Sequence, residues 1–275
     1  MRSDFPLIQI AICADDFGIE SGVDEAIVEL SQSSRLSATS CLTTAKGFPE
    51  RSAWLKGLGI DLGVHLNFTE PLGDAGLYLP LPKLILKSYS HQLDQNEVDA
   101  QIARQLDAFE LHVGRAPDFI DGHLHVHQLP VIRQSLIKQL TQRYPNRRMW
   151  LRNTQPGQLS NALPFMQRFK AQVIGGLGAR ALTQLANQNG LTVNRDFMGA
   201  YDFTKLHPVY AAMLDAWLSN AQNGTLIMTH PAKYVSEDDA FGQDRVQEYR
   251  VLSSELFTLL LEQHGLKLTR LSAQI

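Results

Sequence analysis

Short apolar runs alternate with amphipathic stretches along most of the chain. The first run, Leu7 to Ala14, is almost continuously apolar, which is typical of a strand buried on both faces of a parallel sheet. A helix is expected to begin at Ser21, because this serine is followed by Asp24 and by apolar residues at helical spacing. The chain is therefore predicted to open with a βα unit.

The same alternation continues toward the C-terminus. Further strands are expected at Leu36 to Thr43, Ile60 to Phe68, Phe119-Ile120, Met149 to Arg152, residues 191–197, Thr225 to Thr229 and Leu266 to Leu271. Helices are expected at Pro49 to Lys56, Asn96 to His112, Pro130 to Tyr144, residues 161–171 and 179–189, Pro208 to Asn220 and Gln247 to His264. Residues 69–82 are rich in proline and glycine, and we expect a functional loop there, such as a substrate-binding lid.

Repeated βα units predict a parallel sheet with helices outside it, in a single domain that spans residues 1–275. An open doubly wound sheet and a closed barrel share this pattern. Polar side chains end several strands, and barrels build their sites from the C-terminal ends of many strands. The α/β fold is therefore predicted to be a distorted (β/α) barrel of about seven or eight parallel strands.

Composition narrows the classes of function. The chain has 275 residues with 25 Lys+Arg and 28 Asp+Glu, and its net charge of −3 argues against a nucleic-acid partner. No apolar run approaches the roughly 18 residues of a membrane span, and no signal peptide is expected. Cys13 and Cys41 lie within apolar runs, so we expect buried thiols and a cytoplasmic location. The helix faces reveal no clear interface, so the sequence does not decide between a homodimer and a monomer.

Two adjacent acids follow the first strand. Asp15 and Asp16 come directly after its apolar run, and Gly18 permits a turn that would let both acids face one site. A pair of acids that interacts with a helix dipole is the alternative. The helix begins only near Ser21, which weakens that alternative.

Three of the nine histidines fall within five positions, at His123, His125 and His127. In an extended segment these side chains would share one face with Asp121. Imidazole is a common ligand of zinc-like metals, and a catalytic ion keeps positions open, so not all three need bind. A histidine-rich surface loop is the alternative, but the run lies between a strand and a helix that begins with proline, which favours a metal site.

Ionisable side chains also end three other strands. They are His65, Arg152 and His230, and each alone would more simply be an ordinary core residue. Together with the acids and the histidine run they predict one shared site at the ends of the strands. A carboxylate and two imidazoles suit a divalent ion, a second carboxylate can take a proton from water, and a further histidine can protonate a leaving group. The pattern predicts metal-assisted hydrolysis.

At these motifs the sequence resembles the YdjC-like carbohydrate deacetylases, the family that includes the chitooligosaccharide deacetylase and the hopanoid-associated deacetylase. The resemblance extends over most of the chain. It is carried by Ala14 to Gly18, Gly63 to Leu66, Asp121 to His127 and Thr229 to Pro231. The resemblance implies a distorted barrel related to that of the polysaccharide deacetylases.

The resemblance also implies a metal centre. Asp16, His65 and His123 would be the ligands of one divalent ion. The family favours Mg²⁺, whereas two imidazoles and one carboxylate would also suit Zn²⁺.

Catalytic roles follow from the same resemblance. Asp15 would be the catalytic base, His230 the general acid, and Arg152 the arginine that pairs with the catalytic acid. The expected substrate-binding residues are His125, His127, Phe17 and Asn67.

The implied substrate is an N-acetylated amino sugar, such as a chitooligosaccharide or its phosphate. Water would attack the acetamide carbonyl, and the products would be acetate and a free amino sugar. A metal-dependent phosphoesterase or amidohydrolase on a similar barrel is one alternative. A sugar-binding protein that has lost catalysis is another.

Overall fold

The computed structural model describes residues 6–145, 147–158, 162–201, 210–237, 239 and 241–274. The strands are β1 (Ile8–Phe17), β2 (Ala38–Cys41), β3 (Asp61–Leu66), β4 (Phe119–Gly122), β5 (Trp150–Leu151), β6 (Thr192–Val193), β7 (Asp196–Met198), β8 (Thr225–Thr229) and β9 (Leu266–Leu268). The α-helices are α1 (Ser21–Gln32), α2 (Phe48–Arg51), α3 (Leu81–Tyr89), α4 (Gln95–Val113), α5 (Ile132–Arg143), α6 (Phe165–Gly176), α7 (Ala179–Gln188), α8 (Tyr210–Leu218), α9 (Gly242–Ser253) and α10 (Glu255–Gln263). Short 3₁₀ helices are η1 (Ser52–Leu55), η2 (His123–Gln128) and η3 (Leu271–Ala273).

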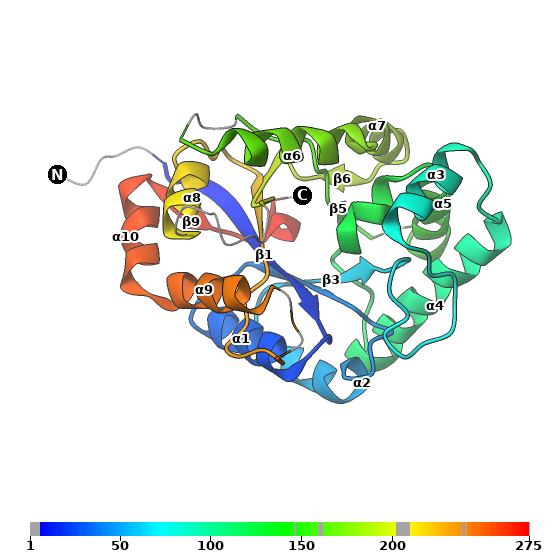
Figure 1. The fold of residues 1–275 in the computed structure, drawn as a ribbon, viewed down its shortest axis with the longest axis horizontal. Helices are drawn as coiled ribbons and strands as arrows, with labels where there is room; N and C mark the ends of the chain where they lie inside the picture. The colour runs from blue at the N-terminus through cyan, green and yellow to red at the C-terminus, as the bar shows by residue number, and fades with distance from the viewer. Residues whose placement is uncertain are drawn as a thin grey trace.

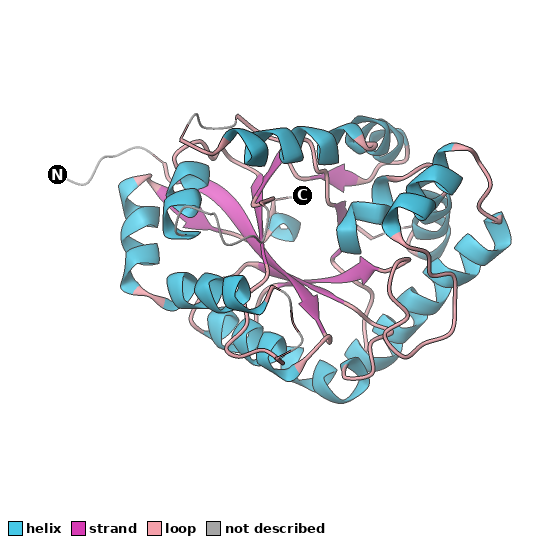
Figure 2. Cartoon of the chain, viewed as in Figure 1, coloured by secondary structure: helices cyan, strands magenta, loops and turns pink. Residues whose placement is uncertain are grey.

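The strands pair in parallel in the order β6-β5-β4-β3-β2-β1-β8-β7, and β9 pairs with the beginning of β1. Only Asn194 and Arg195 separate β6 from β7, although these strands lie at opposite ends of the order. This segment therefore joins the two edges, and the sheet curves into a distorted barrel with the helices outside it (Figures 1 and 2). The predicted α/β barrel is confirmed.

Strand β1 is apolar at successive positions because both of its faces are buried. Ile12 packs in the larger core, which lies between the strands and the helices. Cys13 belongs to a smaller core, made mostly of strand residues, in which the rings of Phe119 and Trp150 stack at 4.0 Å. A Cβ on Gly63 would lie 2.5 Å from the Phe119 ring, so the packing inside the barrel requires glycine there.

Several predicted elements differ in detail. The helix expected over Gln247 to His264 is divided into α9 and α10, because Ser254 between them is extended (ψ 164°). The strand expected over 191–197 is divided into β6 and β7. Helix α3 is not predicted, and it ends the expected loop at Leu81. The helix expected from Pro208 is described only from Tyr210, since residues 202–209 lie outside the described ranges.

Helix α1 begins at Ser21 as predicted, but no side chain caps it. Asp24 instead accepts a hydrogen bond from the Gly18 amide at 2.6 Å, which stabilises the turn after β1. Within the described ranges, every helix is either too short or too polar to cross a bilayer.

Candidate active site

Ionisable side chains converge where the parallel strands end. They are Asp15 and Asp16 on β1, His65 on β3, Asp121 on β4, Arg152 directly after β5 and His230 directly after β8. Strand register places His65 beside Asp121. The predicted site residues from distant segments therefore come together at one end of the barrel.

An irregular backbone allows both acids at the end of β1 to face this site. The register between β1 and β2 shifts between Ala14 and Phe17. Asp16 has a φ of 71°, which is uncommon for a residue other than glycine and costs on the order of 1 kcal/mol or more. The turn expected at Gly18 therefore begins earlier, at Asp16 itself.

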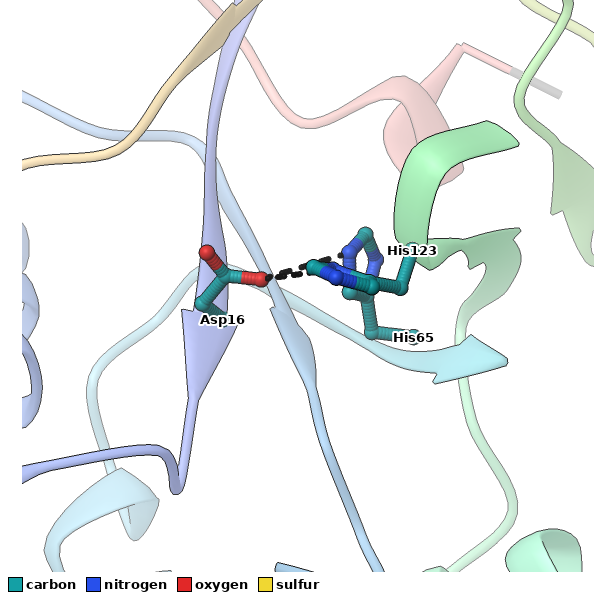
Figure 3. Close-up of side chains that lie close together, drawn as sticks. All are labelled: Asp16, His65 and His123. Carbon is teal, nitrogen blue, oxygen red and sulfur yellow. Dashed lines mark ion pairs between the residues drawn. The ribbon is translucent and has the colours of Figure 1, made fainter. Parts of the chain in front are cut away.

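Asp16, His65 and His123 form a compact group (Figure 3). Asp16 Oδ1 lies 3.5 Å from His65 Nε2 and 3.4 Å from His123 Nδ1. This oxygen is buried and has no well-directed hydrogen-bond donor among the described residues. The other oxygen, Oδ2, accepts a hydrogen bond from Arg245 Nη2 at 2.9 Å. One carboxylate oxygen and two imidazole nitrogens thus converge as a group that could hold a metal ion.

Hydrogen bonds orient the His65 ring toward that group. Its Nδ1 lies 2.7 Å from Asp121 Oδ1 and 3.0 Å from Ser40 Oγ. Because the carboxylate can only accept, Nδ1 donates to Asp121, and Nε2, which faces Asp16, is the nitrogen that could bind a metal ion. A carboxylate behind a ligand histidine is the usual second layer of protein metal sites.

His123 is held from both sides of its ring. Nδ1 faces Asp16, while Nε2 lies 3.4 Å from Glu70 Oε1. Burial opposes protonation of this ring, but the contacts with Asp16 and Glu70 raise its pKa to about 10. The carboxylates of Asp16 and Glu70 therefore favour a positive charge on the His123 ring.

The histidine run is not extended, so that prediction is wrong. Residues 123–128 form η2, and Leu124 and His125 have φ values of 51° and 60°. The three histidines consequently do not share a face. His123 points to Asp16, His125 packs edge-on against Phe197 with ring centroids 5.3 Å apart, and His127 is fully buried.

Asp15 belongs to a separate charged cluster with a buried arginine. Arg152 donates from Nη1 to Asp15 Oδ2 at 2.6 Å and from Nη2 to Asp15 Oδ1 at 2.5 Å. Nη2 also lies 2.5 Å from Asp121 Oδ2. Burial alone would raise the pKa of Asp15, but Arg152 holds it well below its ordinary value. Asp15 is therefore an ionised carboxylate.

A cavity of about 390 Å³ opens onto both clusters. Asp15, His65, His123, His125 and His230 all line it. Burial lowers the pKa of His230 to about 4 although Asp16 and Asp15 favour its protonated form, so this ring is neutral at pH 7. The base and acid candidates thus share one cavity with the candidate metal group.

Glu248 holds the segment that carries His230. Its Oε2 accepts a hydrogen bond from the His230 backbone amide at 2.5 Å and one from the Thr229 hydroxyl. The Tyr201 hydroxyl donates to Oε1 at 2.6 Å. This fully buried carboxylate from α9 therefore stabilises the end of β8.

Three predicted substrate-binding residues do not line the cavity. His127 donates from Nε2 to the Arg152 carbonyl at 2.8 Å and is a core residue. Phe17 is fully buried and packs edge-on against Phe48, with ring centroids 6.4 Å apart. Asn67 is buried, and its Oδ1 accepts hydrogen bonds from the backbone of residues 69 and 70. Asn67 thus orders the turn that carries Glu70, and only His125 of the predicted four lines the cavity.

Four residues of the site are not predicted by sequence reasoning. They are Ser40, Glu70, Arg245 and Glu248. Glu70 lies in the loop expected to be functional, which is the one available signal for it. Arg245 and Glu248 lie among other charged residues on α9, where no spacing sets them apart.

The chain is similar to one protein family over most of its length. Residues 9–263 match the family described as YdjC-like protein. A carbohydrate deacetylase of Homo sapiens is 29% identical over 142 residues, which cover 47% of this chain and 44% of that protein. A chitooligosaccharide deacetylase of Serratia marcescens is 27% identical over 137 residues, 45% of this chain and 52% of that protein. The matched part thus spans about half the length of these relatives.

A further relative matches almost the whole chain, and two solved structures share its fold. A chitooligosaccharide deacetylase of Enterobacter sp. (strain 638) is 24% identical over 287 residues, 94% of this chain and 96% of that protein. A protein of Enterococcus faecalis V583, whose name proposes cleavage of cellobiose phosphate, superposes with a TM-score of 0.70 at 20% identity, over 98% of this chain and 99% of that one. The peptidoglycan N-acetylglucosamine deacetylase Bc1960 superposes with a TM-score of 0.54 at 14% identity, over 96% and 86%. These structures share the fold, and the sequence match establishes that the chain belongs to the family of YdjC-like proteins.

Proposed function

We propose that this protein is a metal-dependent carbohydrate N-deacetylase, which hydrolyses the acetamide of an N-acetylated amino sugar to acetate and a free amine. The observation that carries the proposal is the buried Asp16 Oδ1 facing His65 Nε2 and His123 Nδ1, beside a second, arginine-paired carboxylate in the same cavity. Relatives named carbohydrate and chitooligosaccharide deacetylase support the substrate class. A chitooligosaccharide or its phosphate remains the expected form.

Asp16, His65 and His123 would hold one divalent ion. The buried oxygen of Asp16 without a donor fits this role, as does the tautomer of His65 that Asp121 imposes. When bound, such an ion acts as a Lewis acid on the carbonyl and lowers the pKa of water. Mg²⁺ is favoured by the family resemblance, and Zn²⁺ suits the donor set.

Asp15 is the proposed proton acceptor. It is ionised and lines the cavity, and Arg152 holds both of its oxygens in one orientation. Because Arg152 stabilises the carboxylate, Asp15 would keep a proton only briefly. It would accept the proton of the attacking water and pass it on as the reaction proceeds.

His230 is the proposed donor to the leaving amine. It lines the same cavity, and Glu248 fixes its backbone. A ring with a pKa of about 4 is neutral in the resting enzyme. His230 would therefore gain its proton only when negative charge builds up on the carbonyl oxygen, and would then release it to the amine nitrogen.

The two free, buried cysteines support the cytoplasmic location that we propose for the protein. The function is tested by incubating the protein with N-acetylated chitooligosaccharides and measuring acetate and phosphate, with and without EDTA. We expect acetate release that EDTA abolishes and a divalent ion restores. Phosphate release from a sugar phosphate would favour the phosphoesterase alternative, and tight binding without product would favour a sugar-binding protein.

A further inference from the structure

The cavity is lined by two chemically different sets of side chains. One set is Asp15 and the histidines. The other set, the aliphatic wall, comes from α3, from α6 and the residue after it, and from β8, through Leu81, Ile85, Val173, Ile174, Leu177 and Met228. This wall is thus formed by several elements rather than by one stray side chain.

Among the described residues, few polar groups beside the aliphatic wall could bind sugar hydroxyls. The described polar side chains that line the cavity outside the catalytic cluster are Lys170 and Tyr201. Lys170 Nζ donates to the Tyr201 carbonyl at 2.8 Å, and the Tyr201 hydroxyl donates to Glu248. A hydroxyl that leaves water without a new partner loses roughly 1–3 kcal/mol. A second sugar unit is therefore a poor occupant for the aliphatic wall.

An exposed apolar stripe continues the wall outward along α6. Phe165, Phe169 and Val173 recur every four residues, with exposed fractions of 68%, 53% and 46%. The Phe165 and Phe169 rings stack with centroids 6.3 Å apart, and Val173 also lines the cavity. Eight residues at about 1.5 Å each extend the apolar surface by about 12 Å from the cavity. Figure 1 shows α6 running across the top of the barrel.

We propose that the aliphatic wall and the α6 stripe bind an acyl chain longer than acetyl, so that the enzyme also hydrolyses amino sugars that are N-acylated with a medium or long chain. This inference rests on the proposed amide hydrolysis. The amide C–N bond breaks, the hydroxyl of water bonds to the carbonyl carbon, and the amine takes the remaining proton. A fatty acid and a free amino sugar are the products.

The position of the reacting carbonyl indicates which part of the substrate contacts the aliphatic wall. It favours the acyl chain of the amide over an aglycone of the sugar. The carbonyl must lie at the catalytic cluster, which shares the cavity with Val173 and Met228. The chain attached to that carbonyl is thus the substituent directed along the wall. The sugar ring then faces the solvent, where its hydroxyls find hydrogen-bond partners.

The test compares the N-acetyl, N-butanoyl and N-octanoyl forms of glucosamine, together with the octyl glycoside of N-acetylglucosamine. We expect kcat/KM to rise by up to about fourfold for each methylene that the wall buries, and the octanoyl amide to exceed the octyl glycoside. Val173→Asn should lower the octanoyl-to-acetyl ratio about tenfold. Leu259→Asn, at a residue on α10 that is 59% exposed, is the matched control and should leave the ratio unchanged.

Three negative results of this experiment would lead to different conclusions. Acetate release with no gain for longer chains would overturn this inference and leave the deacetylase proposal standing. A faster octyl glycoside would also overturn it, because the wall would then bind an aglycone. No hydrolysis of any amide would overturn the proposed function, and this inference with it.

Discussion

Two clusters of metal-ligating residue types lie next to each other at the end of β1. One is Asp16 with His65 and His123, and the other is Asp15 with Cys13 and Asp121. In each cluster three ligand atoms lie within 4.8 Å of one another. They differ in what balances their charge, because the second cluster already contains the guanidinium of Arg152.

That difference suggests different chemical roles for the adjacent residues Asp15 and Asp16. Arg152 pairs with both Asp15 and Asp121, and burial raises the pKa of the Cys13 thiol well above its ordinary value, so no thiolate is present. In the first cluster, Arg245 pairs with Oδ2 of Asp16 and leaves Oδ1 facing two imidazoles. Residue type alone does not distinguish the two clusters; what favours the first as the metal site is an Asp16 oxygen that faces two imidazoles and no arginine.

Removing a ligand from the first cluster should have the largest effect. His65→Ala should lose bound metal and acetate release together, with activity falling to the background rate. Metal content after dialysis and acetate release measure both. His91→Asn, at an exposed histidine with φ 54°, is the matched control. Full activity of His65→Ala without metal would break the distinction between the clusters.

Changing the arginine-paired acid should reduce turnover without removing metal. For Asp15→Asn we expect the bound ion to stay and kcat to fall by about 10²–10⁴-fold, as is typical for loss of a general base. Metal content and kcat of the same preparation check this. Loss of metal in parallel with activity would instead make Asp15 a ligand.

Removing the proposed acid should have a smaller effect that depends on the substrate. His230→Ala should keep its metal and lose about 10²–10³-fold in rate on an acetamide, because a poor leaving group needs protonation. An activated acetyl ester should be affected far less. Equal losses on amide and ester would show that His230 only shapes the cavity.

Glu248 offers the smallest effect, on stability. Burial raises its pKa to about 7 although Thr229, Tyr201 and the His230 amide stabilise its ionised form. Between its ordinary pKa of 4.5 and about pH 7 the folded protein therefore holds a proton that the unfolded chain releases, and stability falls as pH rises. At about 1.4 kcal/mol per pKa unit, Glu248→Gln should gain about 2–3 kcal/mol relative to wild type across this window.

Denaturant unfolding at several pH values measures this difference. Glu50→Gln, which removes an exposed carboxylate, is the matched control. A difference between wild type and Glu248→Gln that stays constant from pH 5 to pH 8 would contradict the account of the buried carboxylate.

Burial on both faces explains why the barrel and much of the site are predictable. A strand buried on two sides leaves a continuous apolar run, so an ionisable residue at its end stands out, as Asp16 and His230 do. His65 stands out because it interrupts an apolar alternation. The structure brings Asp16, His65 and His123 together as the prediction requires, and their binding of metal stays a prediction.

The remainder depends on backbone geometry and packing that no pattern reports. Leu124 and His125 adopt positive φ values, which residues other than glycine rarely do, so the extended histidine run is wrong. Arg245 and Glu248 reach the site only because α9 packs beside the ends of β1 and β8. Phe17 adjoins a motif residue, yet its side chain packs in the core.

The central claim is that the metal binds beside Asp16 and not beside Asp15. The most direct test is a crystal grown with Zn²⁺ and measured at its absorption edge. We predict one anomalous peak at about 2.0–2.2 Å from Asp16 Oδ1, His65 Nε2 and His123 Nδ1. A peak among Cys13, Asp15 and Asp121, with Arg152 displaced, would contradict the account.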